Sequence, residues 1–151
     1  MAALEQEIHQ STFKNPYQKA IVNLIYTGNW VNSLHGSVLK KEYGLTVQQF
    51  NVLRILRGQY PEPASVSLII DRMLDKMSNA SRIVERLRKK GLVERKACKS
   101  DRRQVDVLIS EEGLQLLKRL DEDAKRFSNP VENLDSAEVA RLNELLDKLR
   151  G

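Results

Sequence analysis

A mainly α-helical fold with one small β-hairpin is predicted by three features of this 151-residue sequence. Apolar residues recur at spacings of three and four over most of the chain, which is typical of amphipathic helices. Gly, Pro and capping residues separate these segments from one another. One stretch, residues 92–110, instead consists of two extended segments around a charged tip, which indicates a hairpin.

The N-terminal part of the chain predicts a long helix over residues 16–41, with a short separate helix over 3–12 before it. Pro16 suits a first helical turn, with Asn15 as the cap. Gly44 ends the segment. The stripe at helical spacing consists of Ile21, Leu24, Ile25, Gly28, Val31, His35 and Val38.

Two shorter helices are expected next. Thr46 and Gln49 form a capping-box pattern at the start of the first of them. The two prolines of "GQYPEPAS" end that helix, because proline cannot continue one. Ser65 then caps a third helix with the sequence "VSLIIDRML". The apolar stripe of the second helix is Phe50, Leu53 and Leu56.

A fourth helix is predicted from Ser78 to Lys90, with Gly91 in the usual place just past a helix C-terminus. The hairpin follows, and Ser110 then caps a helix that runs to about Phe127. The inward residues of that helix are predicted as Leu114, Leu117, Leu120, Ala124 and Phe127. A last helix is predicted from its cap and its stripe, namely Asp135, Glu138, Val139, Leu142, Leu145, Leu146 and Leu149.

Three helices followed by a hairpin are the plan of a winged helix-turn-helix, in which the third and fourth predicted helices form the helix-turn-helix pair. We therefore expect a single domain over residues 1–151, with about 42–110 as a winged-helix DNA-binding lobe. The helices of about 1–41 and 111–151 carry more apolar surface than such a lobe needs. They are expected to join two chains in a homodimer.

Positive charge is concentrated around the fourth helix and the hairpin. The whole chain has a formal net charge of +5, but residues 72–103 hold twelve Lys or Arg and four Asp or Glu, a net +8. This block has no Phe, Tyr or Trp, whereas RNA-binding surfaces usually stack bases on aromatic side chains. A fold does not fix a function, so a protein-interaction or RNA-binding module stays the alternative to double-stranded DNA binding. An interaction module would not need this charge.

The fourth helix would have one buried face, formed by Ala80, Ile83, Val84 and Leu87. Its N-terminal turn is small or polar, which lets a helix backbone approach base edges in the major groove. Arg82 can reach guanine and Asn79 could pair with adenine. The alternative interpretation is an ordinary solvent-exposed helix without a binding role, on which Glu85 pairs with Lys89. The predicted DNA contacts are Ser78, Asn79, Ser81, Arg82, Arg86 and Lys89.

The hairpin tip, "SDRRQ", is basic, where most tips carry Gly or Asn with small polar residues. An arginine can enter the minor groove, where narrow A·T-rich segments have an enhanced negative potential. An arginine of this tip, Arg102 or Arg103, is therefore expected to enter a groove beside the one that the fourth helix fills. Asp101 repels phosphate, so its expected role is to hold the wing in shape.

The segment "SRIVERLRKKGLVER", followed by "SDRRQVDVLISEEG", resembles the MarR family of bacterial transcriptional regulators over roughly residues 66–115. The resemblance implies an obligate homodimer built from the first and last helices, and a palindromic operator. It also suggests release of DNA by a small-molecule effector or an oxidant. In the family's pattern the wing arginine, here Arg103, contacts the minor groove, and Asp101 shapes the wing. The matching positions are Leu87, Lys90, Gly91, Leu92, Val93, Arg95, Asp101, Arg103, Ser110 and Gly113.

The sequence departs from the family's pattern in two places, the loop before the third helix and the first helix. The loop with Pro61 and Pro63 looks longer than usual. The first helix lacks the cysteine of the family's peroxide-sensing members. Tyr26, Trp30 and Phe50 could line an effector pocket, although packing is the commoner role of such residues.

Other classes of function lack a signal in the sequence. Only His9, His35 and Cys98 are available as the usual bases and nucleophiles, and no catalytic motif surrounds any of them. No four-ligand zinc cluster is visible, so no metal or other cofactor is expected. There is no signal peptide or transmembrane stretch, so we expect a cytoplasmic protein without a membrane partner. The prediction is a DNA-binding repressor, not an enzyme.

Overall fold

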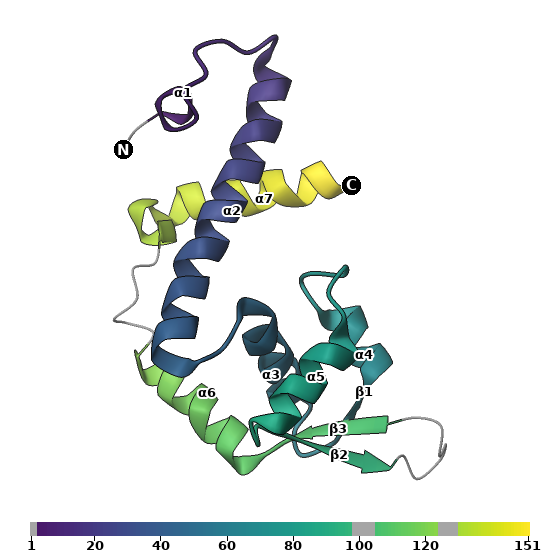
Figure 1. Cartoon of the computed structure of the whole chain (residues 1–151). Coiled ribbons are helices and arrows are strands. Elements are labelled where there is room, and N and C mark those ends of the chain that lie inside the picture. The colour runs from purple at the N-terminus through teal and green to yellow at the C-terminus, as the bar shows by residue number, and fades with distance from the viewer. Residues whose placement is uncertain (1–2, 98–104, 124–129) are drawn as a thin grey trace. The chain divides into compact units, whose positions relative to one another are not determined.

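The structure, a computed structural model, describes residues 3–97, 105–123 and 130–151 (Figure 1). Contacts divide the chain into two compact units, Met1–Asp121 and Glu122–Gly151. The first unit holds the winged helix-turn-helix, and the described part of the second holds one long helix. The predicted fold class is confirmed: the protein is mainly α-helical with a small antiparallel sheet.

The first unit begins with α1 (Leu4–Glu7) and α2 (Pro16–Tyr43). As predicted, the Asn15 side chain caps α2 by accepting a hydrogen bond from the backbone N–H of Gln18 at 2.9 Å, and Gly44 ends it in the left-handed conformation. Residues 8–12, predicted as part of the short helix, lie outside α1. The predicted stripe of α2 is largely exposed on the single chain; Ile25, for example, is 61% exposed.

Two bonds hold α1 against α2. The Lys19 ammonium lies 2.6 Å from the Glu5 carboxylate, and the Tyr26 hydroxyl donates to Glu7 at 2.9 Å. The hydrogen bond from Lys19 lowers the pKa of Glu5, and the bond to Glu7 raises the pKa of Tyr26. Tyr26, which was predicted to line an effector pocket, instead bonds Glu7 and helps to hold α1 against α2.

The core of the winged helix-turn-helix lies between α3 (Val47–Gln59), α4 (Val66–Arg72) and α5 (Ala80–Lys89), which all contact one another. The caps are as predicted: Thr46 and Gln49 form both bonds of a capping box, and the Ser65 hydroxyl accepts from the Leu68 N–H at 3.1 Å. The side chains at the centre of this core are aliphatic, namely Val52, Leu53, Leu56, Ile69, Val84, Leu87, Val107 and Ile109.

A three-stranded antiparallel sheet closes this lobe. The predicted hairpin is β2 (Val93–Ala97) and β3 (Val105–Ile109), and β3 also pairs with the short strand β1 (Ala64–Ser65), so the order is β1-β3-β2. Ala64 lies opposite Val107, and Val93 lies opposite Ile109. Figure 1 shows β2 and β3 side by side, below α4 and α5 in this view. The sequence did not predict β1, because two residues are too short to establish an alternating pattern.

Two helix boundaries differ from the prediction. The third predicted helix, α4, stops at Arg72, where Met73 turns extended and becomes buried. Helix α5 begins at Ala80, not at Ser78, because the Asn79 side chain is the cap and accepts from the Arg82 N–H at 2.9 Å. At the other end, Gly91 has a φ of 72°, as its place past a helix C-terminus predicts.

Helix α6 (Glu111–Asp123) follows the sheet and is capped by Ser110, as predicted. The Ser110 hydroxyl accepts from the Gly113 N–H at 3.1 Å and donates to the Gly91 carbonyl at 2.7 Å. Leu117 and Leu120 are buried as predicted, and so is Leu116, which the prediction omitted. The predicted extension to Ala124 and Phe127 lies outside the described residues.

The second unit contains a 3-10 turn (Pro130–Asn133) and α7 (Ser136–Arg150). Asp135 and Glu138 form the predicted capping box. No residue of α7 is buried, and Leu149 is 65% exposed. Throughout the described ranges, no helix is both long and apolar enough to cross a bilayer.

Candidate nucleic-acid interface

Helix α5 has the two faces that its sequence predicts. Ala80, Val84 and Leu87 are buried against the lobe, and Ile83 is partly buried. The opposite side chains point to solvent, and the exposed ones among the predicted contacts are Asn79, Ser81, Arg82, Arg86 and Lys89. Four of these five residues lie on α5 itself, and the fifth, Asn79, is its N-cap.

Two polar side chains before and at the start of α5 are engaged within the protein. The Ser78 hydroxyl donates to the Asp75 carboxylate at 2.6 Å, and that bond lowers the pKa of Asp75. The Asn79 amide oxygen is used for the cap. A bidentate pair with adenine needs both the oxygen and the NH₂ group of the amide. The amide oxygen has a second lone pair besides the one used in the cap, so the predicted contact of Asn79 with adenine stays a prediction.

Glu85 is bound to two arginines, not to Lys89 as the sequence spacing suggested. Its carboxylate lies 2.9 Å from Arg88 on the same helix and 3.3 Å from Arg95 on β2. The hydrogen bond with Arg88 is the main cause that lowers the pKa of Glu85. This cluster ties the helix to the first strand of the hairpin, and it partly neutralises two cations next to the exposed face.

Lys90 is also used inside the protein. Its ammonium donates to the Gly44 carbonyl at the end of α2 and to the buried Gln49 side chain at 3.2 Å. Within the part of the chain that the structure describes, Arg82, Arg86 and Lys89 have no ion pair. These three cations are therefore the ones that the outer face of α5 can present to an anion.

The tip of the hairpin lies outside the described residues, so Asp101, Arg102, Arg103 and Cys98 keep the roles that the sequence predicts for them. The strands that lead to it and from it are described, and Glu94, Arg95 and Lys96 on β2 are all exposed.

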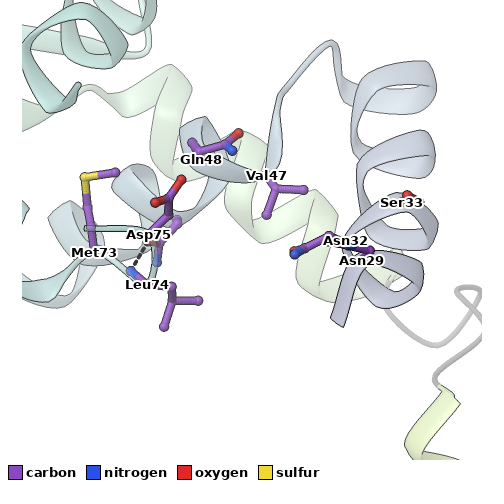
Figure 2. A pocket seen from close by; sticks show the side chains of 9 residues that line it. Asn29, Asn32, Ser33, Val47, Gln48, Met73, Leu74 and Asp75 are labelled. Carbon is purple, nitrogen blue, oxygen red and sulfur yellow. Dashed lines mark hydrogen bonds between the residues drawn. The ribbon is translucent and has the colours of Figure 1, made fainter. Parts of the chain in front are cut away.

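An open pocket of about 520 Å³ lies between α2, α3 and the segment that follows α4 (Figure 2). Its lining mixes side-chain amides with apolar residues, and none of the predicted aromatic residues Tyr26, Trp30 and Phe50 belongs to it. The sequence signal would have been the polar residues of "GNWVNS" on α2, interspersed in the apolar stripe. The full lining is Asn29, Asn32, Ser33, Val47, Gln48, Asn51, Met73, Leu74 and Asp75.

Metal chemistry has no candidate centre among the described residues. No group of three or more His, Cys, Asp or Glu side chains there is placed to hold a metal ion.

Comparison with known proteins agrees with the geometry. The model of a family described as "MarR family" matches residues 43–104. The HTH-type transcriptional repressor IacR of Pseudomonas putida is 32% identical over 125 residues, which cover 78% of this chain and 74% of IacR.

Solved structures show the same fold. A MarR/EmrR family transcriptional regulator from Acinetobacter sp. ADP1 is 25% identical, with a TM-score of 0.72 over 90% of this chain and 95% of that one. Sco3205, a MarR family regulator from Streptomyces coelicolor solved in complex with DNA, has a TM-score of 0.76 at 18% identity, over 93% of this chain and 89% of that one. Taken with the winged helix-turn-helix and its exposed cationic helix, these matches show that the chain belongs to the MarR family of transcriptional regulators.

Proposed function

We propose that this regulator is a homodimeric repressor that binds a palindromic operator in double-stranded DNA, with α5 in the major groove. The observation that carries the proposal is the outer face of α5, where Arg82, Arg86 and Lys89 are exposed without an ion pair among the described residues. The small side chain of Ser81 lies in the first turn, where bulk would hold the backbone away from the bases. Ser78 and Asn79 precede this turn; Ser78 is proposed to bond phosphate or a base, and Asn79 to contact adenine.

The dimer is proposed from apolar surface that each unit leaves exposed. Ile21, Leu24 and Ile25 on α2 are exposed on the single chain, and so are Leu142, Leu145 and Leu149 on α7. Exposed apolar surface of this extent indicates an interaction site. A two-fold symmetric pair is self-complementary, and it would place the two copies of α5 about 34–36 Å apart, one turn of DNA.

A small-molecule effector is proposed to act from the pocket of Figure 2. Asp75 lies in the pocket lining and accepts the hydroxyl of Ser78, which directly precedes the cap of α5. A molecule that drew Asp75 away from Ser78 would loosen the segment that sets the start of α5. This links pocket occupancy to the surface proposed to bind DNA.

The experiment that tests the function is selection of duplexes from a random pool by the full chain, with light scattering on the same sample. We expect enrichment of a palindrome, tighter binding to it than to a scrambled duplex at two salt concentrations, and the mass of two chains. Enrichment of no sequence would favour a protein-interaction module. The mass of one chain at micromolar concentration would rule out the dimer.

The wing gives a prediction that concerns the sequence flanking the operator. Arg103→Ala should cost affinity most where the flank is A·T-rich, because groove narrowing strengthens an arginine contact there. Arg102→Ala should weaken binding on every flank and reduce the salt dependence by about one counterion per wing. Asp101→Ala should weaken binding although it removes a negative charge. Titration against A·T-flanked and G·C-flanked operators measures all three, and tighter binding by Asp101→Ala would contradict the roles assigned here.

Glu85→Gln should make DNA binding more dependent on salt. The substitution removes a negative charge on α5 and leaves Arg88 and Arg95 without their ionic partner. Up to about two further counterions per chain would then be released on binding, which steepens the plot of log affinity against log salt. Glu112→Gln, at an exposed position on α6, makes the same charge change away from the helix and is the control. Equal slopes for the two variants would mean that the arginines stay out of reach of DNA.

A further inference from the structure

The turn between α4 and α5 exposes a large apolar side chain that neither the core nor the pocket uses. Met77 is 94% exposed and Leu74, in the same turn, is 87% exposed. Leu74 belongs to the lining of the pocket in Figure 2, and this open pocket accounts for its exposure. Met77 does not line that pocket, and its exposure needs another cause.

Hydrogen bonds fix the turn on both sides of Met77. The Asp75 carboxylate accepts from the backbone N–H of Met77 at 3.0 Å and from the hydroxyl of Ser78 at 2.6 Å. The Lys76 ammonium donates to the carbonyls of Ile70 and Asp71 at the end of α4.

The start of the turn is held as well. The Leu74 N–H donates to the Asn51 side chain on α3 at 3.0 Å. The backbone around Met77 is therefore pre-organised, and the side chain is held in solvent by bonds on each side of it.

The surroundings of Met77 indicate which partner it meets. It lies two residues before the cap Asn79, and the exposed residues that follow are Ser81 and Arg82. A surface that carries cations without an ion pair among the described residues favours a polyanion. The apolar group that duplex DNA offers in the major groove is the C5-methyl group of thymine.

We propose that Met77 is a specificity-determining residue that contacts the C5-methyl group of a thymine beside the bases read by α5. The proposal rests on the proposed DNA-binding function and adds a base preference to it. Removal of one methyl group from such a contact should cost about fourfold in affinity, the value of one buried methyl or methylene group.

The test replaces single thymines by deoxyuridine in the palindrome that the wild-type chain enriches. Deoxyuridine pairs as thymine does and lacks only the methyl group. We expect one thymine per half-site at which the wild-type protein loses about fourfold in affinity. Met77→Ala should bind the parent duplex more weakly and should lose the response to deoxyuridine at that position, whereas Met77→Leu should keep it.

Leu74→Ala is the matched control, because it truncates another highly exposed apolar residue of the same turn. It should keep the deoxyuridine response of the wild type. A Met77→Ala protein with the wild-type response at every thymine would overturn the contact, and so would a wild-type protein that responds at none. Failure of the wild type to enrich any sequence would instead count against DNA binding itself, so the two failures are distinguishable.

Discussion

Gly113→Ala should destabilise the folded protein by about 1–3 kcal/mol, the usual cost of overpacking a filled site. A Cβ on Gly113 would lie 2.4 Å from the carbonyl oxygen of Leu92 and 2.7 Å from Cγ1 of Ile109. The Leu92 oxygen cannot easily move, because it accepts the backbone N–H of Ser110 at 3.1 Å. The first turn of α6 therefore packs directly on the backbone that leads into β2, and only glycine fits between them.

Gly58→Ala is the matched control for this prediction. Gly58 lies in α3 with nothing within 4 Å of a Cβ built on it. The substitution should leave stability unchanged or raise it by up to about 1 kcal/mol, because alanine favours a helix more than glycine does. Urea unfolding at one fixed protein concentration measures both variants, since an assembly makes stability depend on concentration. Equal unfolding free energies for the two would mean that α6 shifts to accept the methyl group.

Helix caps could be predicted from the sequence because they depend on residues close together in it. Asn15, Thr46, Ser65, Ser110 and Asp135 each bond a backbone N–H two or three residues later, as their positions before apolar stripes indicated. Features that join distant segments gave no such signal. The strand β1 exists only through its pairing with β3, and the pocket only through the approach of α2, α3 and the turn after α4.

Helix α5 also shows that features set by nearby residues could be predicted, whereas contacts with distant segments could not. Its buried and exposed faces follow from helical spacing. Its start was placed two residues too early, because the sequence does not show that Ser78 bonds Asp75 and that Asn79 is the cap. Spacing of four suggested Lys89 as the partner of Glu85, whereas the contact of β2 with α5 brings Arg95 to it from another element. The wing tip lies outside the described residues, so its roles stay predictions.

Arg82→Ala should weaken binding to the selected operator by roughly 1–3 kcal/mol and should relax the preference for one base in each half-site, because a bidentate arginine reads guanine O6 and N7. Arg82 is exposed in the first turn of α5, and its backbone N–H is bound by the Asn79 cap, so the point at which its side chain leaves the helix is fixed.

Lys89, the last residue of α5, is the control, because a cation at that end is expected on a phosphate. Lys89→Ala should weaken binding to the operator and to random DNA by about the same factor. The measurement is affinity for the operator, for its single-base variants and for random duplex at one salt concentration. If Arg82→Ala also lowers specific and random affinity by one common factor, then Arg82 binds only phosphate, and the base preference must come from other residues at the start of α5.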